Sequence, residues 1–152
     1  MTIANTRFHV AALAVLLWAG AARAETVLIT PEEAALPPSP VLTQRGPIPG
    51  PKVEFTAPRS DVAVKPPFAL SVAFGRLSAA DVDPKTVHII VMRGDGVDVT
   101  NRVRGAGRID RAGIDLKDLA APPGEYRIRV TVHDTKERPG FADLVLKVAG
   151  AQ

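Results

Sequence analysis

Three stretches of this 152-residue chain alternate apolar and polar residues with a period of two, and this pattern constrains the fold more than any other feature. Such alternation predicts a β-strand with one buried face, because successive side chains of a strand point to opposite sides. The run at 86–93 is apolar on both faces, as expected of a strand in the middle of a sheet. The alternating stretches are 68–74, 126–133 and 144–148, and shorter candidate strands lie at 53–56, 61–64, 97–102 and 112–116.

Turn-forming residues separate these runs at intervals of about ten residues, and no segment carries the pattern of a long helix. Short strands at regular spacing are typical of two sheets packed face to face. We therefore predict an all-β fold, a single antiparallel β-sandwich of about seven strands. Its buried core is expected to contain Phe68, Leu70, Val72, Phe74, Ile128, Val130, Leu144 and Leu146.

The N-terminal 24 residues have the pattern of a signal peptide. A weakly basic start precedes an apolar run at 10–20, and Ala22-Arg23-Ala24 supplies the small residues that a signal peptidase reads. The run is shorter than the ~20 residues that a membrane-spanning helix needs. We therefore expect export to the periplasm or the extracellular space, cleavage after Ala24, and no membrane span in the mature chain.

Composition excludes several classes of protein. The chain has no cysteine, so neither disulfides nor a lipid-modified cysteine can form. Cleavage would remove Arg7 and Arg23, which leaves one net positive charge of the formal +3. A balance so close to neutral gives no reason to expect nucleic acid or anionic lipid as a partner.

Proline dominates the region between the predicted cleavage site and the first strand. Seven of the 21 residues from 31 to 51 are proline. Because proline fixes φ and lacks a backbone donor, this region is predicted to be extended and mostly solvated. The expected organisation is a signal peptide (1–24), a proline-rich extended leader (25–51) and the β-sandwich (52–149). A second interpretation makes the leader a ligand for a proline-binding groove.

Four segments, "PPFALSVAF" (66–74), "TVHIIVMRGDGVDVTNRV" (86–103), "LAAPPGEYRIRVTVHD" (119–134) and "LVLKV" (144–148), resemble bacterial immunoglobulin-like domains of exported proteins. The resemblance covers residues 46–149. It implies an immunoglobulin-like sandwich in which Tyr126 forms a tyrosine corner, with its hydroxyl bonded back to the backbone. The Cys…Trp…Cys core of antibody domains is absent, which excludes that branch.

The residues that could carry catalysis are few. Only His88 and His133 remain after cleavage, and no serine lies in a nucleophile-elbow motif. The segment "RGAGR" (104–108) lacks the third glycine of a dinucleotide-binding fingerprint and follows no βαβ pattern, so we interpret it as a flexible loop. We expect neither an enzyme nor a bound cofactor.

Copper binding is the alternative to a purely structural module. Small exported copper carriers with an immunoglobulin-like fold are similar to this chain in architecture, and that similarity implies a histidine at the mature N-terminus and a Ser-x-Asp-Gly-His type segment. This chain is instead expected to begin at Glu25, and the comparable segment "VHDTKERPG" (132–140) contains only His133. His88 and Met92 share one strand face but lie ~13 Å apart, too far for shared ligation. The turn aspartates are interpreted as solvated rather than as calcium ligands: Asp81, Asp83, Asp95 and Asp98.

Arginines provide the candidate binding surface. They cluster between 102 and 111 and recur at alternate positions along the stretch 126–133. One interpretation is a solvated sheet face whose charges prevent edge-to-edge aggregation. The functional interpretation is contact with an acidic protein or an envelope polymer, through Arg102, Arg104, Arg108, Arg127 and Arg129.

The tripeptide Arg93-Gly94-Asp95 has the sequence that adhesion proteins present to integrins. Here it lies between two predicted strands, and Asp-Gly is a dipeptide favoured in tight hairpins. We therefore predict a turn rather than an adhesive loop. A two-residue loop would place Arg93 opposite Asp98, and a three-residue loop would place Val91 opposite Val99.

Together these features favour an exported, non-enzymatic immunoglobulin-like module, used for protein–protein interaction or for a structural role in the cell envelope. The alternative is a periplasmic copper-binding carrier of the same fold.

Overall fold

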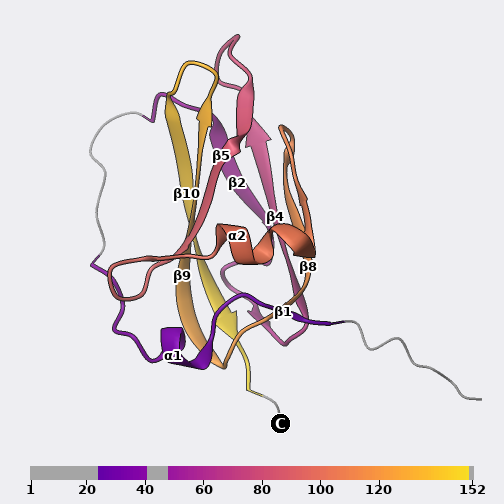
Figure 1. Cartoon of the computed structure of the whole chain (residues 1–152), viewed down its shortest axis with the longest axis vertical. Helices are drawn as coiled ribbons and strands as arrows, with labels where there is room; N and C mark the ends of the chain where they lie inside the picture. The colour runs from indigo at the N-terminus through magenta and orange to yellow at the C-terminus, as the bar shows by residue number, and fades with distance from the viewer. Residues whose placement is uncertain (1–23, 41–47, 151–152) are drawn as a thin grey trace, which may run out of the picture.

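Two five-stranded sheets pack face to face in the computed structural model, which describes residues 24–40 and 48–150 (Figure 1). The first sheet has the order β1 (Thr26–Val27), β8 (Gly113–Ala120), β4 (Phe68–Gly75), β2 (Lys52–Ala57), with β7 (Gly107–Ile109) also paired to β8. The second has the order β3 (Ala63–Val64), β10 (Pro139–Val148), β9 (Gly124–Asp134), β5 (Val82–Val91), β6 (Val97–Asp98). Two helical turns, α1 (Pro31–Ala34) and α2 (Thr100–Val103), and a 3₁₀ turn at Arg104–Ala106 complete the described chain.

The core lies between the sheets and follows the alternating pattern of the sequence. Seven of the eight expected core residues are buried, and the eighth, Phe74, is partly buried against them. The prediction of a two-layer β fold is thus confirmed at the level of a β-sandwich-like arrangement. No helix in residues 24–40 or 48–150 is long and apolar enough to cross a membrane.

The sheets are mixed, so the prediction of a wholly antiparallel sandwich of about seven strands is wrong. β1 pairs in parallel with β8, and β3 pairs in parallel with β10. Parallel neighbours need a long connection rather than a tight turn. Both short strands reach their partners from distant parts of the chain, and such pairings leave no signal in the local sequence.

The predicted strand 97–102 is also wrong beyond Asp98. The Asp98 carboxylate accepts a hydrogen bond from the Thr100 N–H, and the chain then turns into α2. Helical spacing lets Val99 and Val103 point together into the core, where both are fully buried. The interpretation of 104–108 as a flexible loop fails as well, because this segment forms the 3₁₀ turn and the start of β7.

Residues 24–40, here called the N-terminal strap, run across one end of the sandwich (Figure 1). Leu28 and Ile29 are buried in the core, and Thr30 and Glu33 form a reciprocal capping box that begins α1. The prediction of an extended leader is therefore wrong for this part of the chain. The capping box stabilises the first turn of α1, and burial of Leu28 and Ile29 stabilises the docked strap. The proline content of the segment indicates neither effect. The predicted signal peptide lies outside the described residues, except for Ala24.

Candidate binding surface

The five predicted arginines do not form one patch. Arg127 and Arg129 alternate along β9 and point away from the core on the outer face of the second sheet. Arg108 belongs to β7 of the first sheet, while Arg102 and Arg104 lie on α2 and the 3₁₀ turn. The sequence cluster at 102–108 and the row on β9 are thus separate surfaces.

Three of these arginines are neutralised within the fold. Arg102 donates to both carboxylate oxygens of Glu33, at 2.6 and 2.8 Å, and to the Leu28 carbonyl. This hydrogen bonding lowers the pKa of Glu33, in spite of partial burial that acts in the opposite direction. Arg108 pairs with Asp110 at 3.0 Å. Arg102 therefore fastens the strap to α2, and Arg108 pairs locally.

Arg129 is the third neutralised arginine. It faces Asp143 across the β9–β10 ladder and donates two hydrogen bonds to that carboxylate, at 2.7 and 2.9 Å. These bonds raise the pKa of Arg129. Its guanidinium also lies 4.8 Å from the centre of the Phe141 ring. The Arg129 side chain therefore links the neighbouring strands β9 and β10.

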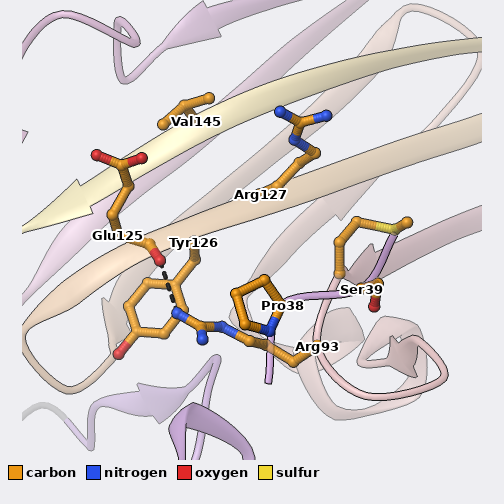
Figure 2. A pocket seen from close by; sticks show the side chains of 8 residues that line it. Pro38, Ser39, Arg93, Glu125, Tyr126, Arg127 and Val145 are labelled. Carbon is orange, nitrogen blue, oxygen red and sulfur yellow. Dashed lines mark hydrogen bonds between the residues drawn. The ribbon is translucent and has the colours of Figure 1, made fainter. Parts of the chain in front are cut away.

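Arg127 has different surroundings. It faces Val145 on β10, and its carbonyl accepts the Met92 N–H on the other side. No carboxylate in residues 24–40 or 48–150 forms an ion pair with it. Figure 2 shows the Arg127 guanidinium and the Glu125 carboxylate on opposite sides of the Val145 side chain. Arg127 is therefore a cation that lies beside an apolar side chain and forms no ion pair within the described residues.

Two hollows flank Met92 on this outer face, and we call them the paired hollows. The first, with a volume of about 170 Å³, is drawn in Figure 2. The second has a volume of about 350 Å³. The first is lined by Pro38, Ser39, Met92, Arg93, Glu125, Tyr126, Arg127 and Val145. The second is lined by Ser39, Pro40, Ile90, Met92, Gly94, Asp95, Gly96 and Arg129.

The strap builds one wall of both hollows. Its Ser39 N–H donates to the Met92 carbonyl at 3.1 Å, and the Pro37 carbonyl accepts the Gly94 N–H at 2.8 Å. The Ser39 hydroxyl also donates to the Gly94 carbonyl at 2.8 Å. An extended segment therefore lies along the β5–β6 loop and is held by backbone hydrogen bonds. Sequence reasoning missed these hollows because their walls come from segments far apart in the chain.

Arg93 is occupied by this arrangement. Its guanidinium donates to the Leu36 carbonyl at 3.0 Å and to the Glu125 carbonyl at 2.8 Å, and it lies 5.2 Å from the centre of the Tyr126 ring. The predicted hairpin is confirmed, and Gly94 and Gly96 have positive φ. Arg93, the first residue of the Arg-Gly-Asp sequence, thus helps to hold the strap in place.

Both predicted hairpin registers are wrong. Val91 pairs with Val97 and Ile90 with Asp98, so the connection runs through residues 92–96. The loop is longer than predicted because its backbone groups bond to the strap instead of closing the ladder at once. Asp98 lies opposite Ile90 rather than Arg93, and its carboxylate forms a hydrogen bond of 2.7 Å with His88.

Tyr126 is structural, as predicted. The residue is only 2% exposed, and its hydroxyl donates to the Pro122 carbonyl at 2.8 Å. Burial raises the pKa of the phenol, and the nearby Arg93 acts in the opposite direction. Tyr126 therefore lines the first hollow but presents little of its surface to a ligand.

The candidate metal ligands are not brought together. His88 bonds to Asp98, while His133 lies on β9 at another hollow, near Asp83 and Asp134. Within the part of the chain that the structure describes, no group of three or more His, Asp or Glu side chains is placed to hold a metal ion. The copper-carrier alternative therefore has no such ligand group to support it in this part of the chain.

Comparison with known proteins does not identify the class of this protein, so the class is described from its geometry. No family model, no curated protein and no solved structure matches this chain. Its described residues define a two-sheet, β-sandwich-like protein with paired hollows on the outer face of one sheet.

Proposed function

We propose that this chain is an exported, non-enzymatic module with an immunoglobulin-like fold that binds another protein of the cell envelope through the outer face of its second sheet. Support for export comes from the signal-peptide pattern at residues 1–24. Support for the immunoglobulin-like fold comes from the two packed sheets and from the Tyr126 hydroxyl bonded back to Pro122.

One observation carries the binding role: Arg127 lines the first of the paired hollows with Met92 and Val145, and it has no ion-pair partner in the described residues. Arginine and methionine are enriched at the centres of protein–protein interfaces. An arginine that a fold does not neutralise is free to bind a group supplied by a partner. Arg102, Arg108 and Arg129 are instead held in ion pairs, and Arg104 lines neither hollow.

Site-specific photo-crosslinking tests this proposal. The photoreactive residue p-benzoyl-phenylalanine would replace Val145 beside the paired hollows and, as a matched control, Ala73 on the outer face of the first sheet. Ala73 is exposed and lies in β4. After irradiation of cell-envelope preparations, we expect a discrete protein adduct from position 145 and at least a fivefold lower yield from position 73. Equal yields from the two positions, or no adduct from position 145, would refute the proposal.

A further inference from the structure

The two hollows differ in charge. Arg93 and Arg127 line the first hollow against a single acid, Glu125, which in turn faces Lys147 across the ladder. In the second hollow, Arg129 is already paired with Asp143, and Asp95 adds an acid to the lining. The first hollow thus favours a negatively charged group.

The second hollow is more apolar. Ile90, Met92 and Pro40 contribute to its wall, and its polar members are Ser39 of the strap, Asp95 of the β5–β6 loop and Arg129. Apolar surface of this kind is stabilised by an aliphatic side chain that displaces water from it.

The spacing of the hollows follows the strand repeat. Arg127 lines the first and Arg129 the second, and these residues are two apart on β9. Alternate side chains of an extended chain recur every ~6.8 Å on the same face. A ligand that runs along β9 in an extended conformation therefore places side chains two positions apart at the two hollows.

From this match we infer that the surface recognises an extended polypeptide segment in which an aspartate or glutamate is two positions from an aliphatic residue. The carboxylate bonds to Arg127, and the aliphatic side chain enters the second hollow beside Ile90. Guanidinium binds carboxylate in a fork geometry, which fixes the register of the segment. This inference rests on the proposed function and names the chemistry of its partner.

An anionic polysaccharide would use the same arginine but not the rest of the surface. Sugar rings stack on exposed aromatic faces, and the described residues contain no tryptophan. The Tyr126 ring is buried, and Arg129 lies over the Phe141 ring. The apolar second hollow would contribute little to such a ligand, so the geometry favours a peptide.

Peptide display tests the inference directly. A random library of peptides of about 12 residues is selected on the immobilised chain from Glu25 onward, and the enriched peptides are synthesised and measured by fluorescence polarisation. We expect an acidic residue two positions from an aliphatic one, and binding at least tenfold weaker to Arg127→Glu. Arg127→Lys should stay within about threefold of the wild type, and Ile90→Thr should reduce the preference for the aliphatic residue.

The matched control is Arg104→Glu, an identical charge change at an exposed position of the 3₁₀ turn, which should bind like the wild type. Circular dichroism would establish that each variant is folded. Enriched peptides without an acid, equal binding to Arg127→Glu, or no enrichment at all would overturn the inference. Displacement of the peptides by polygalacturonate at equal carboxylate concentration would also overturn it, in favour of a polymer ligand.

The crosslinking experiment separates this inference from the proposed function. An adduct from position 145 that persists unchanged in the Arg127→Glu background would leave the binding role intact and remove the acidic-segment specificity. Absence of the adduct in the wild-type background would instead remove the binding role itself.

Discussion

Replacement of Leu28 by alanine tests whether the N-terminal strap belongs to the cooperatively folded core. Leu28 is fully buried, and its N–H donates to the Ala120 carbonyl at 2.8 Å. The change removes about three carbon groups, worth roughly 2–2.5 kcal/mol of burial at ~0.8 kcal/mol each. The cavity left behind adds to this cost, so the free energy of unfolding should fall by roughly 3–4 kcal/mol.

Leu36→Ala is the matched control, because it makes the same change in the same segment. Leu36 is 39% exposed, so the expected loss is below ~1 kcal/mol. Urea unfolding followed by far-UV circular dichroism would measure both variants, with the slope m checked for constancy. In thermal unfolding, Leu28→Ala should lower the melting temperature by roughly 10–15 °C for a domain of this size.

Two results would refute this reasoning. Equal losses for the two variants would mean that the strap contributes no more at its buried position than at its exposed one. In the second, the Leu28→Ala variant would keep the main unfolding transition at its wild-type midpoint and show a separate, smaller transition before it. That result would mean that the strap unfolds independently of the sandwich.

Three further outcomes can be measured on the same protein. Tyr126→Phe loses a hydroxyl hydrogen bond of 2.8 Å to a backbone carbonyl and should reduce the free energy of unfolding by about 1–2 kcal/mol; an unchanged value would argue against a structural tyrosine. Because the pKa of Glu33 is lowered in the folded state, its pair with Arg102 stabilises above the ordinary pKa of 4.5, and that contribution is lost as the pH falls through the lower folded-state pKa. The stability difference between wild type and Glu33→Gln should therefore shrink with acidification; a difference that grows would contradict the sign. Gly96→Val should cost ~1 kcal/mol or more in thermal unfolding, since φ is 94° there, whereas Gly105→Val, where a Cβ meets no atom within 4 Å, should cost less.

The sheets could be predicted from the sequence because burial on one face of a strand imposes a period of two. Tyr126, Ile128 and Val130 alternate with polar residues and point inward along β9. The same rule located most of β4 and the second half of β10. The parallel pairings of β1 and β3 could not be predicted, since a two-residue strand has no period and its partner lies far along the chain.

The strap left a local signal that its prolines obscured. Thr30-Pro31-Glu32-Glu33 has the spacing of a capping box, with proline at the first helical position, and it follows an apolar run at 27–29. These features would have predicted a short docked helix rather than an extended leader.

The candidate surface was only partly predictable. Arg127 and Arg129 could be placed on one strand face from their spacing, but not distinguished from each other. Their difference depends on Asp143 and Val145, which face them from β10. The pairing of Arg102 with Glu33 joins residues distant in sequence, and a list of arginines by position does not contain that information.

The pairing of β1 with β8 sets an order of events during biosynthesis. A ribosome makes Thr26 long before its partner Leu119, and β2 to β7 lie between them in sequence. The strap therefore cannot dock until β8 has left the ribosome and the loop between them has closed. Until then Leu28 and Ile29 lie outside the core, so a segment near the start of the chain is among the last to reach its native place, and a chain that ends before residue 120 lacks β9 and β10 as well as the end of the strand on which the strap docks.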